Sequence, residues 1–178
     1  MKKFWHIALM FLCALVISSC GKDDDDKKLE VDEVWKAQNI EFFENLLKDP
    51  SFEKLYSQSN AGFILYKVLE EGKSNEQIFY TSKLSLYYKG TFVNGDVFDD
   101  HTFDAGEPYM GKDGLGAPVY DFVDGFATAL QYMHPGDKWE IYVPYQLGYG
   151  DSGKKGIVNI LPFTTLHFVV EVVEVMEP

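Results

Sequence analysis

VDGFATALQYMHPGDKWEIYVPYQLGYG, residues 123–150, is the stretch that decides the fold of this 178-residue chain. Its first third has a helical period: Phe126, Leu130 and Met133 recur at the spacing of one helix face. Asp124 stands just before them and is a candidate N-cap, because an Asp side chain accepts hydrogen bonds from the free N–H groups of a first turn. The pattern predicts a short amphipathic helix.

The period then changes from helix to strand. Pro135 and the glycine after it interrupt the helix. Trp139, Ile141 and Val143 follow at alternating positions, which is typical of a strand. The stretch ends on Tyr149 between two glycines. A short helix, a turn, a strand and a tyrosine-tipped loop together predict a pocket with aromatic walls.

Alternating or apolar runs elsewhere predict further strands, and polar runs rich in Asp, Gly and Pro predict loops. An Asn94-Gly95 pair between two such runs is a strong hairpin signal. We expect a twisted antiparallel sheet with one short helix across it, which is an α+β fold. The predicted strands are 63–69, 84–88, 97–99 and 165–175, and the predicted loops are 100–118 and 151–155.

A separate helix is predicted over residues 31–48, where apolar residues recur at helical spacing until Asp49-Pro50 ends it. A shorter helical or irregular piece is expected after it, through Tyr56. This helical arm either packs on the sheet domain, which is the default for an apolar helix face, or pairs with a partner.

Three ordered motifs resemble FKBP-type peptidyl-prolyl isomerases. Residues 123–150 are similar to the family's V-I-x-G-W/F helix, strand and L-A/G-Y-G loop. Tyr88-Lys-Gly followed by Phe98-Asp99 is similar to its Y-x-G, turn and F-D. Thr164-Thr-Leu-His-Phe168 resembles the A/T-T-L-x-F of its last strand. The resemblance covers residues 60–176, about two thirds of the chain, and implies an FKBP-like sheet wrapped on one short helix.

The resemblance also implies a set of site residues. Phe126 takes the place of the pocket floor, where the family commonly has Trp. The backbone N–H of Val123 would meet a substrate carbonyl, and the Tyr149 hydroxyl would donate a hydrogen bond to the substrate. The residues implied in catalysis are Tyr88, Phe98, Asp99, Phe126, Tyr149 and Phe168; those implied in substrate binding are Phe122, Val123, Ile157, Val158 and Tyr120.

The implied activity is cis–trans isomerisation of X-Pro bonds in proline-containing polypeptides that fold outside the cytoplasm. An aromatic pocket suits this reaction, because it favours the twisted amide over the planar one without a nucleophile or a metal. We therefore expect no cofactor and no metal; the acidic residues near Asp99 match no calcium loop. Two alternatives stay open: a catalytically weak binding or chaperone module, and an envelope lipoprotein that binds glycan.

The N-terminus has the features of a targeting segment. Lys2 and Lys3 precede an apolar run over residues 4–17, which is short for a membrane span. Ile17-Ser-Ser-Cys20 resembles a bacterial lipobox, so we expect lipid on Cys20 and an anchor in the outer membrane, on its periplasmic or surface face. An ordinary secretory signal with a chance cysteine is the alternative.

The acidic charge excludes some partners. The formal net charge is −12, and every basic residue is a lysine. A negatively charged surface repels the phosphates of nucleic acid, so a nucleic-acid partner is not expected. The run GKDDDDKK at residues 21–28 is typical of a solvated tether, and it also resembles an export signal of some surface lipoproteins. We expect four regions: a signal peptide (1–19), an acidic tether (20–30), a helical arm (31–58) and an FKBP-like domain (59–178), of unknown oligomeric state.

Overall fold

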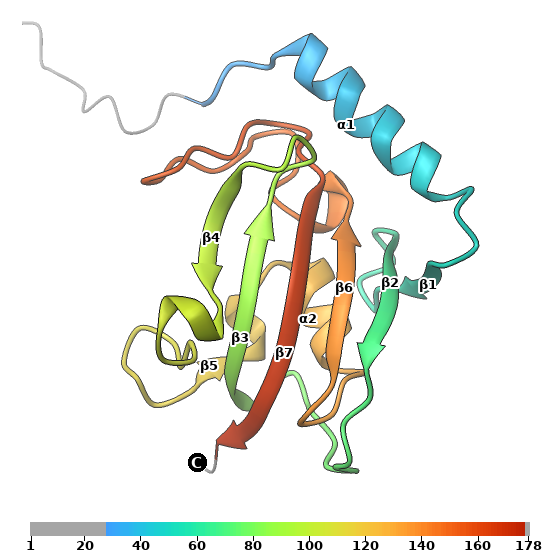
Figure 1. Ribbon diagram of the computed structural model, residues 1–178. Helices are drawn as coiled ribbons and strands as arrows, with labels where there is room; N and C mark the ends of the chain where they lie inside the picture. Colours follow the sequence, from blue (N-terminus) through green and yellow to red (C-terminus); the bar gives the residue numbers. More distant parts are fainter. Residues whose placement is uncertain (1–27, 177–178) are drawn as a thin grey trace, which may run out of the picture.

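The computed structural model describes residues 28–176 and shows an antiparallel sheet with a short helix behind it and a longer helix at one end (Figure 1). The strand order is β1-β2-β6-β7-β3-β4, and β5 pairs with β3 next to β4. The strands are β1 Glu53–Tyr56, β2 Phe63–Glu70, β3 Lys83–Thr91, β4 Val97–His101, β5 Ala117–Pro118, β6 Lys138–Val143 and β7 Leu166–Met176. The helices are α1 Glu33–Leu46 and α2 Asp124–Leu130, with single 3₁₀ turns η2 Phe103–Ala105, η3 Val119–Asp121 and η4 Tyr145–Leu147.

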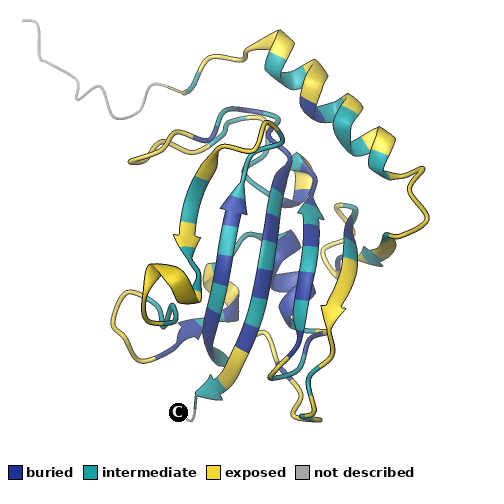
Figure 2. Ribbon diagram, in the orientation of Figure 1, coloured by how far each residue is buried: buried dark blue, intermediate teal, exposed yellow. Residues whose placement is uncertain are grey.

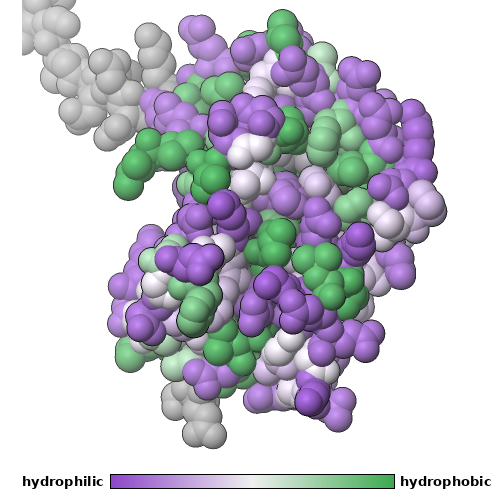
Figure 3. Space-filling view, viewed as in Figure 1, coloured by the Kyte–Doolittle hydropathy of each residue, from purple (hydrophilic) through white to green (hydrophobic). Residues whose placement is uncertain are grey.

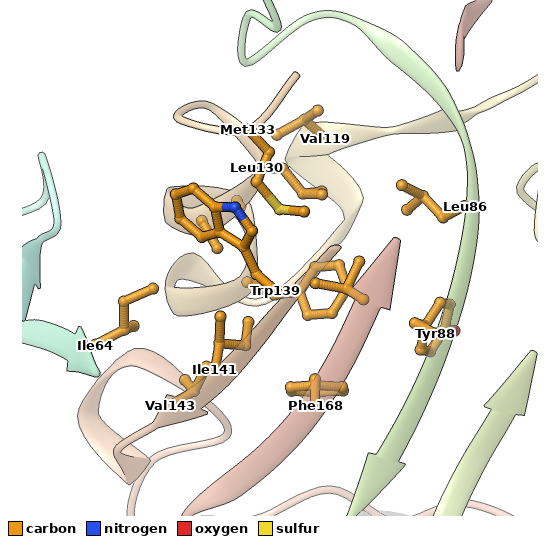
Figure 4. Close-up of a cluster of buried hydrophobic side chains, with 14 of the residues drawn as sticks. Ile64, Leu86, Tyr88, Val119, Leu130, Met133, Trp139, Ile141, Val143 and Phe168 are labelled. Atoms are coloured by element: carbon orange, nitrogen blue, oxygen red, sulfur yellow. The ribbon is translucent and has the colours of Figure 1, made fainter. Parts of the chain in front are cut away.

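The core lies between the sheet and α2. Burial alternates along the central strands, so that every second side chain faces the helix (Figure 2). Figure 4 shows the resulting cluster, in which side chains from β2, β3, β6 and β7 converge on α2 and the turn after it. Gly125 allows this contact, because a side chain there would collide with Val143 of β6. The predicted apolar face of the last strand, at Leu166, Phe168, Val170 and Val172, is buried as expected.

The α+β class and the antiparallel sheet are confirmed, and most predicted strands appear with extended ends. The predicted loop 100–118 contains two short regular pieces, η2 and β5. The helical or irregular piece expected before Tyr56 is wrong in part. Residues Glu53–Tyr56 form β1, an edge strand that pairs antiparallel with β2, because the chain turns back at residues 57–62 and the two segments meet in register.

The helical arm packs on the sheet domain. Its N-cap is Asp32, whose carboxylate accepts hydrogen bonds from the N–H groups of Val34 and Trp35. Trp35 Nε1 donates to Thr164 Oγ1 at 2.8 Å, and the ring of Phe42 lies 5.7 Å from that of Tyr142 on β6. Of the two arrangements that the sequence left open, the structure shows α1 docked across the end of the sheet (Figure 1).

Hydrophilic residues cover much of the molecular face in Figure 3, and apolar residues form separate patches between them. This distribution is ordinary for a chain with a net charge of −12. Within residues 28–176, neither helix combines the length and the hydropathy that a membrane span needs. The predicted signal peptide, Cys20 and the acidic residues up to position 27 lie outside the described residues.

Candidate active site

A cavity of about 330 Å³ opens between β3, β4, the η3–α2 segment and the loop after β6. The sequence motifs that supply it are up to about 80 residues apart, and the sheet order brings them together. Eight of the eleven predicted pocket residues line this cavity: Tyr88, Phe98, Asp99, Phe122, Val123, Phe126, Tyr149 and Phe168.

Aromatic rings form the floor and walls of the cavity. Phe126 is almost fully buried at the floor, and its ring stacks on that of Phe122 at 4.7 Å between centroids. Phe168 and Tyr88 meet the Phe126 ring edge to face at 4.7 and 5.6 Å. Such edge contacts are the favoured geometry of aromatic pairs, so the rings hold one another in place and give the cavity an aromatic floor.

Gly90 on β3 lets one wall form. The ring of Phe98 lies across the backbone of Gly90 and meets the ring of Phe168 at 5.5 Å. A Cβ at position 90 would stand 2.5 Å from the Phe98 ring and 3.0 Å from that of Phe168. The glycine of the Tyr88-Lys-Gly90 motif is therefore needed for the close approach of two pocket rings.

Asp99 at the rim of the cavity is held in place by its neighbours. The Tyr88 hydroxyl donates to Asp99 Oδ2 at 2.8 Å, and His101 Nε2 lies 3.1 Å from the other carboxylate oxygen. Burial, followed by the neighbouring negative charge of Asp99, raises the pKa of Tyr88 far above its usual value. Tyr88 therefore stays protonated and keeps Asp99 at the rim in a fixed orientation.

Asp124 has a different role from the predicted N-cap. The N-cap residue of α2 is Val123, no side chain caps the helix, and Asp124 is its first helical residue. The Asp124 carboxylate instead accepts hydrogen bonds from the hydroxyls of Ser57, at 2.8 Å, and Ser59. Hydroxyls from the turn after β1 reach this carboxylate, and they tie the start of α2 to the edge of the sheet.

Donors for a carbonyl stand at the cavity mouth. Lys154 Nζ donates to the Tyr149 hydroxyl oxygen at 3.3 Å and lies 5.0 Å from the centre of its ring. Because the Lys154 ammonium can only donate, it leaves the hydroxyl hydrogen of Tyr149 available for an acceptor in the cavity. Among residues 28–176, the backbone N–H of Val123 has no hydrogen-bond partner either.

Three predicted residues do not line the cavity. Tyr120 is half exposed and its ring lies 6.2 Å from that of Tyr80, on the other side of the η3–α2 segment. Ile157 is fully exposed and Val158 partly so, in the loop before β7. Their predicted part in substrate binding would need that loop to move or a substrate longer than the cavity.

Residues that sequence reasoning missed also line the cavity. Tyr109 joins the wall and bridges to β3 through Leu86, and Lys112, Asp121 and Lys154 stand around the mouth. Tyr109 could have been found from the sequence, because it is the one tyrosine of a long polar loop. The charged residues Lys112, Asp121 and Lys154 show no sequence pattern that would mark them as pocket residues. In the described part of the chain, no group of three or more His, Cys, Asp or Glu side chains is arranged to hold a metal ion.

Comparison with known proteins identifies the family of the chain. Residues 75–173 match the family described as FKBP-type peptidyl-prolyl cis-trans isomerase. Peptidyl-prolyl cis-trans isomerase Mip of Coxiella burnetii is 34% identical over 115 residues, which cover 65% of this chain and 46% of the relative. Outer membrane protein MIP of Legionella longbeachae is 31% identical over 110 residues, or 62% of this chain and 43% of that protein.

A solved structure supports the fold. The crystal structure of a peptidyl-prolyl cis-trans isomerase from Pseudomonas syringae superimposes with a TM-score of 0.64 at 23% identity, covering 82% of this chain and 96% of that one. The family match spans more than half of the chain, so the chain belongs to the FKBP-type peptidyl-prolyl cis-trans isomerases. It spans less than half the length of the two curated relatives named above.

Proposed function

We propose that this chain catalyses the cis–trans isomerisation of X-Pro bonds in polypeptides, with the aromatic cavity as its active site. The observation that carries the proposal is the cluster of mutually packed aromatic side chains around Phe126, which lines the floor of the cavity of about 330 Å³. This volume lies at the small end of the range for ligand sites and suits a proline with its preceding residue.

The catalysis rests on the environment of the amide. Rotation about a peptide bond has a barrier of about 18–20 kcal/mol, because twisting breaks the amide resonance. The planar amide has a larger dipole than the twisted one, so transfer from water into an apolar cavity disfavours the ground state more than the transition state. Phe126, Phe168 and Tyr88 supply that apolar environment.

Two donors position the substrate. The free N–H of Val123 and the hydroxyl hydrogen of Tyr149 are available to carbonyl oxygens on either side of the proline. Asp99 takes part by holding Tyr88 and not by moving a proton, since no proton transfer is needed to rotate an amide. Phe98, over Gly90, closes one side of the cavity against water.

The test is a protease-free isomerisation assay on the full-length chain with several X-Pro peptides. We expect Phe98→Ala to lower kcat/KM by about tenfold or more, equivalent to about 1.4 kcal/mol, and Tyr149→Phe to lower it less. Tyr56→Ala is the matched control, because it removes an exposed ring on β1, away from the cavity, and should leave the rate unchanged.

A folded wild-type chain that accelerates none of these peptides would remove the proposed activity. Peptide binding measured on the same sample would then decide between a binding module with an isomerase fold and a chain that does not use this cavity at all. Loss of activity in Tyr56→Ala as large as in Phe98→Ala would instead place catalysis elsewhere.

We also propose that the chain acts outside the cytoplasm, anchored in the outer membrane through lipid on Cys20. The support is the basic, then apolar segment that ends in Ile17-Ser-Ser-Cys20, together with a relative whose name places it in an outer membrane. Cys20→Ala should abolish incorporation of radiolabelled palmitate and release the chain from membranes. Labelling that persists in Cys20→Ala would contradict the proposal.

A further inference from the structure

A second hollow, larger than the aromatic cavity, lies elsewhere on the described structure. A groove of about 790 Å³ runs along the C-terminal end of α2, between the turn after β1 and the connection from β2 to β3. That connection lies below the sheet in Figure 1. An adjoining hollow of about 380 Å³ shares four lining residues with the groove: Gln58, Tyr80, Gln131 and Tyr132. We call the two hollows the α2 groove; it shares no lining residue with the aromatic cavity.

Exposed aromatic rings gather at the α2 groove. Phe79, Tyr80 and Tyr132 line it with 58, 54 and 51% of their surface exposed, and Tyr120 stands beside Tyr80. These four are most of the aromatic side chains with large exposure between residues 28 and 176. Exposed rings gathered at a hollow mark an interaction site more often than scattered ones do.

Exposed amide side chains line the same groove. Within the described chain, the side-chain amides of Gln58, Asn75 and Gln77 have no hydrogen-bond partner. The Gln131 side chain donates one hydrogen bond, from Nε2 to the carbonyl of Ala127, and its amide oxygen remains available as an acceptor. A primary amide offers two donors and an acceptor on one rigid plane, so this groove presents both kinds of group side by side.

The α2 groove is nearly uncharged on a strongly acidic protein. Its only carboxylate, that of Asp124, already accepts hydrogen bonds from Ser57 and Ser59. His134 pairs with Asp137, at 3.5 Å from Nδ1 to the carboxylate. A neutral polar ligand could bind here without meeting an unpaired charge, whereas charged ligands gain nothing from this lining.

We propose that the α2 groove binds a neutral oligosaccharide. A sugar ring has an apolar face of C–H groups that packs on an exposed tyrosine ring, and at its edge hydroxyls that each donate and accept. The amide-and-ring lining matches both features. A proline-rich polypeptide also packs on rings, but it offers carbonyl acceptors and few donors, so it would leave the amide oxygens unpaired. This site is independent of the proposed isomerase activity.

The test is a titration of the full-length chain, in a detergent without a sugar headgroup, with three neutral hexasaccharides built from α-glucose, β-glucose and N-acetylglucosamine. We expect saturable quenching of tyrosine and tryptophan fluorescence by at least one of them below about 10 mM. Tyr132→Ala and Gln77→Ala should each weaken that binding by about tenfold, while prolyl isomerisation stays at the wild-type rate. Phe103→Ala is the control, because it removes a still more exposed ring outside the groove.

The proposal is overturned if no hexasaccharide binds up to that concentration, or if binding survives in the Tyr132→Ala, Tyr80→Ala double variant. Binding of a proline-rich peptide that Tyr132→Ala abolishes would assign the groove to polypeptide instead. The source of the sugar is tested with a protein to which the best-bound hexasaccharide has been coupled, and with the same protein uncoupled. Capture of the coupled form alone indicates protein-linked glycan, and capture of neither, with hexasaccharide binding intact, indicates polysaccharide.

Discussion

Gly90 is the residue whose lack of a side chain decides the shape of the proposed active site. The rings of Phe98 and Phe168 meet over its backbone, and nothing larger than hydrogen fits between them. Its backbone is not among the positive-φ glycines, and it pairs with Asp99 of β4 and Phe168 of β7, although the register to β4 shifts just after it. The requirement for glycine is therefore steric and belongs to the cavity.

Gly90→Ala should lower isomerase activity by about tenfold and destabilise the fold by about 1–3 kcal/mol, the usual cost of overpacking. The added methyl would push Phe98 off its contact with Phe168 and open the cavity wall to water. The protease-free assay and urea unfolding measure the two effects. Gly156→Ala is the matched control, because its added Cβ would make only an ordinary 3.4 Å contact. Equal isomerase activity in Gly90→Ala and Gly156→Ala would show that catalysis does not depend on the position of the Phe98 ring.

At the scale of elements, the docking of α1 depends on one buried side chain. Asn39 is fully buried; its Oδ1 accepts the backbone N–H of Thr165 at 2.8 Å, and its Nδ2 donates to the carbonyl of Trp35. The Thr165 hydroxyl in turn donates to the Asn39 carbonyl at 3.3 Å. The hydrogen bonds between Asn39 and Thr165 hold α1 against the start of β7. The aromatic contacts around them are less directional.

Asn39→Ala should destabilise the docked helix by about 1–3 kcal/mol, because the Thr165 N–H would stay buried without an acceptor. Hydrogen exchange of the α1 amides reports this locally, and urea unfolding reports it globally. Asn45→Ala on the same helix is the control, since Asn45 is exposed and, within residues 28–176, its side chain hydrogen-bonds only with Lys48. Unchanged α1 exchange in Asn39→Ala would mean that the aromatic contacts alone hold the helix.

For the whole molecule, buried tyrosines couple stability to alkaline pH. Burial, then the nearby charge of Glu140, raises the pKa of Tyr142 to about 12, and burial raises the pKa of Tyr88 further. An unfolded tyrosine ionises near pH 10. Above pH 10 the unfolded chain therefore releases protons that the folded chain retains. The contribution of these tyrosines to the free energy of unfolding is fully present below about pH 10. It is lost as the pH rises through their pKa values in the folded chain.

We expect the free energy of unfolding to fall as the pH rises from 10 to 12, and to fall less steeply in Tyr142→Phe, which lacks one of the linked protons. Urea unfolding at a series of pH values measures the slope. The exposed Tyr132, changed to Phe, shows how much of the slope a solvent-facing tyrosine contributes. Identical slopes in wild type and Tyr142→Phe would contradict the assigned burial effect.

Much of the fold follows from local pattern. The strand spacing of Trp139, Ile141 and Val143, and the alternation along 165–175, predicted β6 and β7 because a half-buried strand must place every second side chain in the core. The short segment 53–56 was missed, since four residues at a sheet edge carry little periodicity. Pairing with β2, not its own sequence, makes it a strand.

By itself, the sequence determined the α+β class, the central strands, α2 and the aromatic residues that face it, because helix and strand periods are local properties of the chain. Only the tertiary structure decided which loop residues reach the cavity. It brought in Tyr109 and Lys154 and left out Tyr120 and Ile157, and it paired Asp124 with hydroxyls more than 60 positions earlier in the chain. Loop positions depend on contacts between distant segments, and local spacing has no information about those contacts.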